Sequence, residues 1–283
     1  MAQQDLRIKE LQDKVIAPGQ TIRNMEYAKV NGQSLQLDLY LPASKDSFPV
    51  IVFIHGGGFT AGDKSSAAAY APFFTARGFA IASINYRLAP AAIFPDQIYD
   101  VKGAIRFLRA HATQFHLDPD RLAVFGTSAG GALASLAGVS CDVANLEGTV
   151  GGNSKYSSCV QATVNCFGSF SYENMMNTGF APSREIHLEE LFGCKDIYSE
   201  ACREKIKMMA PESYIDKADG HFLILHGEKD TSVPLQNSID FDKKLKAGGV
   251  SSILITDPHF GHGEGIIKAH FSEIIAFLTK ALQ

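Results

Sequence analysis

The sequence predicts an α/β fold, in which a mostly parallel sheet of eight strands carries helices on both faces. Three observations lead to this prediction: an opening hairpin, an alternation of strands and helices after residue 49, and strands that are apolar on both faces. A chain of 283 residues, 46% hydrophobic and 20% charged, can bury the core of one such fold. Residues 1–283 are therefore expected to form a single domain.

Eight extended runs rich in β-branched and aromatic residues are the predicted strands. They span residues 21–30, 34–41, 49–54, 79–85, 121–126, 160–167, 221–226 and 251–256. Asn31-Gly32 separates the first two runs and is a strong signal for a tight hairpin turn. Runs such as "VIVFI" and "FLIL" lack polar alternation, as expected for strands covered on both sides.

Residues 96–110 and 264–281 have the apolar spacing of amphipathic helices. Their apolar faces consist of Ile98, Val101, Ile105 and Leu108 in the first, and Ile267, Phe271, Ile274 and Leu278 in the second. Asp96 and Asp100 lie one turn apart in the first helix and are interpreted as a solvated face.

Residues 169–220 interrupt the alternation with a long stretch of helical and loop character between two strands. Such a segment is expected to be a helical cap or lid over the carboxyl ends of the strands, where sheets of this kind bind ligands. Its run "EIHLEELFG" offers side chains that either line a pocket or pack against the sheet: Ile186, Leu188, Leu191 and Phe192.

The net charge of −4 and the absence of a Lys/Arg cluster argue against nucleic acid or an anionic membrane as a partner. No window approaches the roughly 18 consecutive apolar residues that span a bilayer. The start, "MAQQDLRIKELQDK", has no signal-peptide character, although a leader could have been removed. A soluble monomer or homodimer is expected.

Five cysteines include no CxxC pair, so we expect no thiolate metal site, and no other cofactor is indicated. Cys166 lies in the apolar run "VQATVNCF" and is expected to be buried. The other four could form the bridges Cys141–Cys159 and Cys194–Cys202, or all five could be reduced, as in a cytoplasm. The bridged alternative favours an extracytoplasmic location.

The stretch Gly126-Thr127-Ser128-Ala129-Gly130 carries the sharpest chemical signal. This G-x-S-x-G pattern follows a predicted strand and opens a helix of small residues, which is the context of a nucleophile elbow. Ser128 would project its hydroxyl from a strained turn at a helix N-terminus, and the flanking glycines would make room for that turn. The alternative is a glycine- and serine-rich turn without chemistry.

A serine nucleophile needs a base and an acid, which this pattern supplies in the order Ser, acid, His. Downstream, "HFLILHGEKDTSVP" and "SSILITDPHFGHGEG" each read as a strand followed by a loop. Asp230 in the first loop is the predicted acid and His262 in the second the predicted base. The competing residues are Glu228, Asp257 and His259, while His226 is interpreted as structural.

The run "VIVFIHGGGF", residues 50–59, is a predicted strand followed by glycines. These glycines are expected at the sheet edge where the predicted elbow also lies. Acyl transfer passes through an oxyanion that preorganised backbone N–H groups stabilise, and glycines bring such groups close. Gly57, Gly58 and Ala129 are the predicted donors of this oxyanion hole. A flexible turn would explain the glycines but not their position directly after a buried strand.

With these residues in place, the chain resembles α/β-hydrolases of the hormone-sensitive-lipase-like group. It is most similar to carboxylesterases of the bifunctional acetylxylan/feruloyl esterase type, from about residue 25 to the C-terminus. The likeness rests on "HGGGF", "INYRLAP", "FPDQIYDVKGAIRFLR", "GTSAGG", "LEGTVGGNSKYSSCVQA", "HGEKDTSVP" and "GHG". It implies Ser128, Asp230 and His262 as the triad, with Gly57, Gly58 and Ala129 as the oxyanion hole. It also implies that His55 organises the oxyanion loop.

Two departures from the family bear on the substrate. Thr127 stands where many relatives carry Asp, and the chain has no Trp, a residue that often follows the glycines in relatives. Aromatic rings commonly stack on sugars and feruloyl groups. The aromatic candidates for substrate contact here are Phe59, Tyr86, Phe170, Tyr172 and Phe180. A role in the core or the lid is the alternative for the last four.

The sequence therefore predicts a metal-independent serine carboxylesterase for short-chain or compact acyl esters, among them carbohydrate acetyl or feruloyl esters. An arylformamidase or other amidase is the alternative enzyme, because the same base can protonate an amine. A third possibility is a non-catalytic protein that binds a small molecule. The presence of all three predicted triad residues argues against it. No interfacial activation is expected, since nothing outside the lid candidate looks like a lipid-docking surface.

Overall fold

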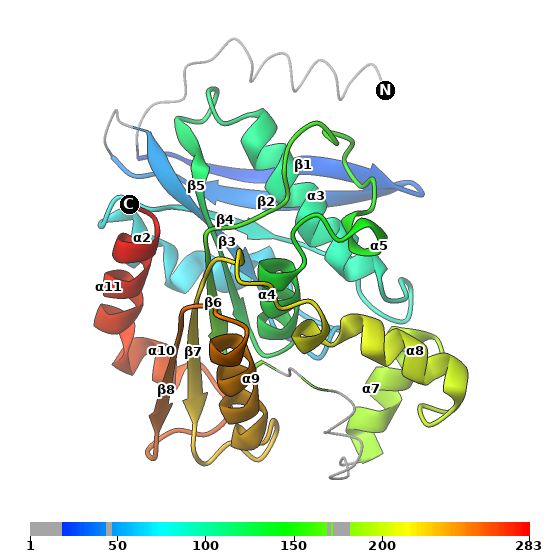
Figure 1. Cartoon of the computed structure of the whole chain (residues 1–283). Helices are drawn as coiled ribbons and strands as arrows, with labels where there is room; N and C mark the ends of the chain where they lie inside the picture. The colour runs from blue at the N-terminus through cyan, green and yellow to red at the C-terminus, as the bar shows by residue number, and fades with distance from the viewer. Residues whose placement is uncertain (1–18, 44–46, 169–170, 172–181) are drawn as a thin grey trace.

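The computed structural model describes residues 19–43, 47–168, 171 and 182–283, and one eight-stranded sheet runs through it (Figure 1). The strands are β1 (Thr21–Val30), β2 (Gln33–Tyr40), β3 (Phe48–Ile54), β4 (Ala80–Ile84), β5 (Leu117–Thr127), β6 (Ala162–Cys166), β7 (His221–Gly227) and β8 (Ser252–Asp257). Their order is β1-β2-β4-β3-β5-β6-β7-β8, with β1 and β2 antiparallel to their neighbours and the rest parallel. The predicted α/β fold with its mostly parallel sheet is confirmed.

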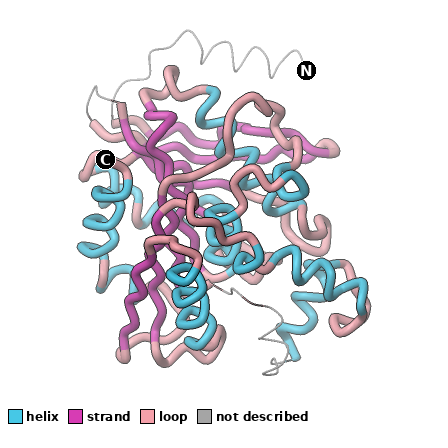
Figure 2. Tube along the Cα trace, in the orientation of Figure 1, coloured by secondary structure: helices cyan, strands magenta, loops and turns pink. Residues whose placement is uncertain are grey.

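Helices flank the sheet on both sides (Figure 2). They are η1 (Lys64–Ala69), α2 (Ala71–Thr75), α3 (Asp96–Ala110), α4 (Ala129–Val139), α5 (Ala144–Glu147), α7 (Pro182–Phe192), α8 (Glu200–Met209), η2 (Pro211–Ser213), α9 (Leu235–Ala247), α10 (Gly265–Ala269) and α11 (Phe271–Ala281). Side chains of α2 and α11 share one core cluster, whereas those of α3 and α4 belong to the cluster on the opposite face.

The opening hairpin forms at the predicted turn. Asn31 and Gly32 both have positive φ, 48° and 86°, which is the backbone signature of a two-residue type I′ turn. Val30 pairs directly with Gln33 across it.

The helix predicted over residues 264–281 is interrupted. α10 ends at Ala269 and α11 begins at Phe271, because His270 leaves the helical conformation (φ −108°, ψ 27°). The His270 ring lies 3.0 Å from Asp257 Oδ2 and 3.2 Å from Glu273 Oε1. The predicted apolar face survives this break, with Ile274 among its fully buried residues.

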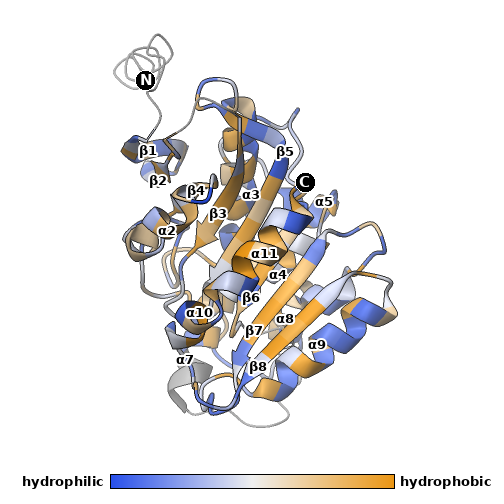
Figure 3. Cartoon of the chain, turned by 90° about the vertical axis from the view of Figure 1, so that its left-hand side faces the viewer, coloured by the Kyte–Doolittle hydropathy of each residue, from blue (hydrophilic) through white to orange (hydrophobic). Residues whose placement is uncertain are grey.

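The helix after the predicted elbow, α4, is buried along its whole length. Its glycines allow this close packing: a Cβ added at Gly138 would lie 2.2 Å from Thr163 Oγ1, and one at Gly131 would lie 2.8 Å from Asn165 Oδ1. In Figure 3, β7 and β8 are predominantly hydrophobic while much of α9 is hydrophilic, as expected for a helix with a solvated outer face. β7 is buried over all but its first residue, whereas β8, at the edge of the sheet, is only partly covered.

The predicted solvated face of Asp96 and Asp100 is wrong for Asp100, which is fully buried. Arg87, in the loop after β4, donates to it from Nη2 (2.8 Å) and Nε (2.9 Å), and Arg87 Nη1 lies 2.9 Å from Asp96 Oδ2. Burial of a carboxylate is costly without such a partner. The partner comes from the loop between β4 and α3, so the spacing within the helix could not reveal it.

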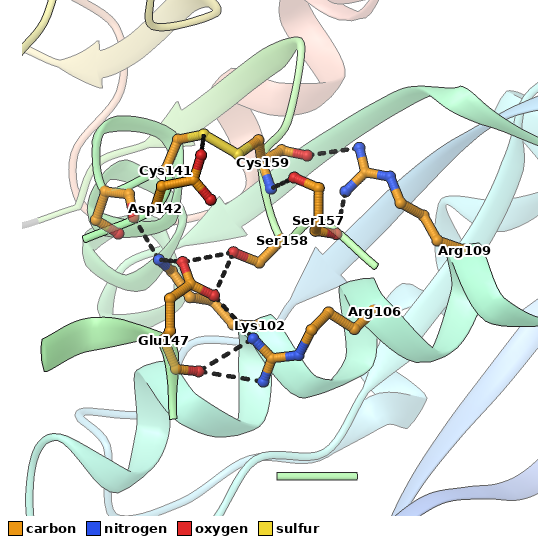
Figure 4. Close-up of a disulfide and its surroundings, with 10 residues drawn as sticks. Lys102, Arg106, Arg109, Cys141, Asp142, Glu147, Ser157, Ser158 and Cys159 are labelled. Atoms are coloured by element: carbon orange, nitrogen blue, oxygen red, sulfur yellow. Dashed lines mark hydrogen bonds and ion pairs between the residues drawn. A yellow bond between two sulfur atoms is a disulfide. The ribbon is translucent and has the colours of Figure 1, made fainter. Parts of the chain in front are cut away.

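A second buried ionic cluster ties the segment after α4 to α3 (Figure 4). Lys102 and Arg106 are buried on α3, and their side chains lie 2.6 Å and 2.8 Å from the carboxylate of Glu147. Lys102 also donates to the carbonyl of Ser140 at the end of α4. Ser158 donates to the same carboxylate at 2.8 Å. The loop that leads from α4 into β6 is thereby fixed to the helix beneath it.

The five cysteines divide into two disulfides, Cys141–Cys159 and Cys194–Cys202, and one buried thiol, Cys166. The first bridge spans the loop that Glu147 anchors (Figure 4). The second joins the end of α7 to α8.

We expect a thiol titration of the denatured, unreduced protein to find one thiol per chain, that of Cys166, and five after reduction. The reduced sample is the control for complete reaction with the reagent. Five thiols before reduction would exclude both bridges, and with them the argument for an extracytoplasmic location.

Within the described residues, no helix is both long and apolar enough to cross a membrane.

Candidate active site

The segments that carry the predicted site residues all leave the sheet at one edge. Ile54, which precedes the glycine run, pairs with Gly126 at the start of the elbow. Farther along the sheet, Gly227 pairs with Asp257, so the loops after β7 and β8 begin side by side. The carboxyl ends of parallel strands are where such sheets bind ligands.

Ser128 sits in a strained backbone conformation at the start of α4. Its φ of 51° and ψ of −118° are unusual for a residue with a side chain, as the predicted elbow requires. A Cβ at Gly126 would lie 2.0 Å from the carbonyl oxygen of Gly130, and one at Gly130 would lie 2.1 Å from that of Ile54. Both flanking positions therefore exclude any side chain.

The three residues predicted as a triad are in hydrogen-bond contact. His262 Nε2 lies 2.9 Å from Ser128 Oγ, and His262 Nδ1 lies 2.8 Å from Asp230 Oδ2. A carboxylate only accepts, so Nδ1 carries the proton and Nε2 is left to accept from the serine hydroxyl. This arrangement can withdraw the Ser128 proton as the oxygen attacks a carbonyl carbon.

The carboxylate of Asp230 is fully buried and has a donor for each oxygen. Oδ1 accepts from the backbone amides of Ser232 (2.7 Å) and Val233 (2.8 Å). Burial opposes its ionisation, but hydrogen bonds from His226, His262 and the Val233 amide outweigh burial and hold the pKa of Asp230 well below its usual range. Asp230 is therefore ionised at neutral pH.

Backbone contacts hold the acid and base loops together. Lys229 N donates to the carbonyl of Phe260 at 2.9 Å. A Cβ at Gly227 would meet that same carbonyl oxygen at 2.4 Å, so glycine is needed there for the loops to approach. The ring of Phe167, directly after β6, packs edge-on against His262 with centroids 4.9 Å apart.

The competing acids and bases are engaged elsewhere. Asp257 accepts from the His259 amide (2.8 Å) and contacts the ring of His270. Glu228 accepts from Thr256 at 2.9 Å. Among the hydrogen bonds of the described residues, none links these carboxylates or the His259 ring to Ser128 or His262.

The predicted oxyanion loop lies against the elbow. A Cβ at Gly56 would lie 2.9 Å from Thr127 O and 3.3 Å from Ser128 Cβ. Gly57 (φ 114°) and Gly58 (φ 62°) have backbone conformations that favour glycine. The amide of Ala129 belongs to the first turn of α4, where N–H groups have no partner within the helix.

His55 braces this loop. It is buried, Nδ1 lies 2.7 Å from the Gly56 carbonyl oxygen, and a Cβ at Gly62 would press on the ring at 2.4 Å. The ring of Tyr86 stacks on it at 4.3 Å, and Tyr86 Oη donates to the His55 carbonyl at 3.1 Å. Burial lowers the pKa of His55, so its ring is neutral and suits an organising role.

Two of the aromatic side chains predicted to contact substrate are buried. Phe59 and Tyr86 are 5% and 3% exposed and belong to the hydrophobic core, which leaves their rings little surface for a substrate. Packing against the oxyanion loop and its supporting core accounts for both. Phe170, Tyr172 and Phe180 lie outside the described residues.

Helix α7 of the segment between β6 and β7 borders the site. Leu191 and Phe192 are buried, Leu191 O accepts from Phe94 N at 2.8 Å, and the Phe94 and Phe192 rings meet edge to face. They pack in the core, as does the buried Leu188, whereas the side chain of Ile186 lies outside the described residues. His187 Nδ1 approaches Thr60 Oγ1, beside the glycine loop, at 3.5 Å.

Sequence reasoning missed two side chains that touch the triad, Phe167 and His226. Phe167 follows directly after a predicted strand at the same sheet edge, which is a weak signal. His226, interpreted as structural, lies 3.2 Å from Asp230 Oδ2. Within the described residues, a cluster close enough to hold a metal ion is Cys141, Asp142 and Cys159, but its sulfur atoms are joined in a disulfide.

Known proteins with a similar sequence or structure include several esterases. The BD-FAE family model matches residues 37–245. Esterase LipC of Mycobacterium tuberculosis is 30% identical over 217 residues, 76% of this chain and 53% of that protein. The chain spans about half the length of this relative and of two other curated proteins of the same organism that it resembles.

Two solved structures superpose well. A bifunctional GH43-CE protein of Bacteroides eggerthii is 35% identical with a TM-score of 0.82, covering 93% of this chain and 38% of that one. A truncated carbohydrate esterase from gut microbiota is 31% identical with a TM-score of 0.83, covering 94% and 97%. The resemblance drawn from the motifs is thus confirmed, and the chain belongs to the BD-FAE family, with an α/β-hydrolase fold.

Proposed function

We propose that the protein is a serine carboxylesterase that cleaves compact acyl esters, with acetylated carbohydrates as the leading substrate class. The observation that carries the proposal is the hydrogen-bonded series Ser128–His262–Asp230, with contacts of 2.9 Å and 2.8 Å, next to a glycine loop. Similarity to a carbohydrate esterase and to esterase LipC supports the reaction class. The proposed substrate class rests on the similarity to the carbohydrate esterase.

In the proposed mechanism, Ser128 Oγ attacks the ester carbonyl while His262 Nε2 takes the hydroxyl proton. The resulting oxyanion would accept from the backbone amides of Gly57, Gly58 and Ala129. The alcohol leaves with the proton from His262, and an acyl-serine remains. Water then attacks this ester, His262 accepts the proton of the water, and the carboxylic acid departs as Ser128 regains its proton.

The segment 169–220 is proposed to form a cap on one side of this site. Support comes from the contact of His187 on α7 with Thr60, just beyond the oxyanion loop.

Covalent labelling tests the serine nucleophile directly. A reactive organophosphate, diisopropyl fluorophosphate, should phosphorylate one serine per chain and stop hydrolysis of p-nitrophenyl acetate in parallel. Peptide mass spectrometry should place the adduct on Ser128, and Ser128→Ala should take up none. Inhibition without an adduct on Ser128 would contradict the proposed nucleophile.

The substrate class is tested by comparing kcat/KM for acetylated xylo-oligosaccharides, methyl ferulate, p-nitrophenyl acetate and N-formylaniline. We expect the acetylated oligosaccharides to be the best of the four. A higher kcat/KM for N-formylaniline would replace the esterase assignment by an amidase one, while leaving the triad in place.

A further inference from the structure

The imidazole of His226 is a second ring, beside that of His262, in contact with the Asp230 carboxylate. His226 is on β7, one residue from the end of the strand, and is fully buried. Its Nε2 is 3.2 Å from Asp230 Oδ2, the same oxygen that His262 Nδ1 contacts at 2.8 Å. Two imidazoles therefore share one carboxylate oxygen.

The contacts of the ring fix where its proton lies. Nε2 is also 2.9 Å from the carbonyl oxygen of Val233, and a carbonyl can only accept. Nε2 therefore carries a hydrogen, which is donated to Val233 O, and Asp230 Oδ2 lies 3.2 Å from the same nitrogen. Nδ1 lies 2.7 Å from Ser238 Oγ on α9, and in the neutral ring it accepts the hydroxyl proton. His226 thus joins β7, the acid loop and α9.

The other oxygen of Asp230 leaves little freedom for the carboxylate. Oδ1 is held by two backbone amides, so Oδ2 must face both rings. Among the described residues, the ionisable groups in contact with Asp230 are His226 and His262, and its remaining donors are backbone amides. Any change in the charge that Oδ2 offers to His262 must come through His226.

We propose that His226 is a positioning residue that sets how strongly Asp230 binds and orients His262. This inference rests on the proposed function, because it assigns His262 as the base. A carboxylate oxygen divides its negative charge among its donors, so a second N–H on Oδ2 weakens the hold on the His262 imidazolium. The His226 N–H therefore competes with His262 for Oδ2 and holds that oxygen in line with Nδ1 of His262.

The test compares His226→Phe, which fills the space without an N–H, with His226→Gln, whose amide can still donate to Asp230. For His226→Phe, the acidic limb of the pH profile of kcat/KM should move to higher pH by about 0.5 to 1 unit. Its kcat/KM near neutral pH should fall about 10- to 100-fold, as when other outer-shell partners are lost. In His226→Gln, the acidic limb should stay at the pH of the native protein, and most of kcat/KM near neutral pH should be retained.

Ser238→Ala is the matched control, because it removes the partner of Nδ1 and leaves the Nε2–H in place. It should leave the acidic limb unmoved. If His226→Phe does not fold, as judged by circular dichroism, His226→Asn takes its place, since its shorter amide cannot reach Asp230. Equal losses in the Phe and Gln variants with no shift of the limb would overturn the inference in favour of simple packing.

A second measurement separates failure of this inference from failure of the proposed function. The imidazole of His262 is titrated by NMR, with and without His226→Phe, in a Ser128→Ala background that needs no turnover. A pKa of His262 that rises in the double variant supports the inference even if the native protein hydrolyses no ester. An unchanged pKa in an active esterase overturns the inference and leaves the esterase standing.

Discussion

Ser128→Ala should reduce kcat for p-nitrophenyl acetate by several orders of magnitude, about 10⁶-fold in the best-studied serine hydrolase. Without Oγ there is no attacking oxygen, and His262 loses the hydroxyl that lies 2.9 Å from its Nε2. The fold should be unaffected, because the strained backbone of the elbow accepts alanine as well as serine. Initial rates at saturating ester measure the effect.

Ser135→Ala is the matched control for this experiment. Ser135 lies on the same helix, is buried and contacts Asn165 Nδ2 at 2.5 Å, but it makes no contact with His262 among the hydrogen bonds of the described residues. It should keep activity within a few-fold of native. Comparable rates for native protein and Ser128→Ala would mean that the elbow is inert, and ligand binding would then be the reading to pursue.

Asp230→Asn should lower kcat by about 10⁴-fold, the loss known for this change in a serine protease triad. The two backbone amides at Oδ1 would hold the carbonyl oxygen of the new amide in that place. Its NH₂ would then replace Oδ2 and donate to His262 Nδ1. His262 would be driven to the tautomer that carries its proton on Nε2, which cannot accept from Ser128.

Asp257→Asn supplies the comparison for the acid, because Asp257 was the competing carboxylate and lies at the end of the neighbouring strand. Its contacts run to His259 and His270, away from the triad, so kcat should stay within a few-fold of native. Profiles of kcat against pH for both variants measure the outcome. A greater loss of kcat in Asp257→Asn than in Asp230→Asn would mean that Asp257, and not Asp230, is the acid.

The sheet and the principal site residues could be predicted because each depends on a local pattern. The dipeptide Asn31-Gly32 is itself a signal for a tight turn. The glycines of the elbow and Ser128 lie within one stretch of five residues. Placing Asp230 and His262 depended on the order Ser, acid, His and on the fact that parallel strands end at one edge of the sheet.

The features that escaped prediction depend on three-dimensional contacts that neither residue type nor spacing along the chain shows. Asp100 looked solvent-facing until Arg87 from another loop met it in the core. His226 looked structural because nothing near it in sequence shows that Asp230 turns back toward its ring. Phe59 and Tyr86 have the chemistry of a sugar platform, and only packing decides that they face the core. Residue type and spacing carry no information about such contacts.

The position of Ser128 depends almost wholly on main-chain atoms. Gly130 fits against the carbonyls of Ile54 and His55, Gly126 fits against Gly130, and Ser128 N donates to the Cys166 carbonyl at 2.9 Å. Every residue type has the same main-chain carbonyl, so side chains at most surrounding positions can be exchanged without moving Ser128. A lineage with such an elbow can therefore remodel the walls of its pocket and acquire new substrates while its reaction stays the same.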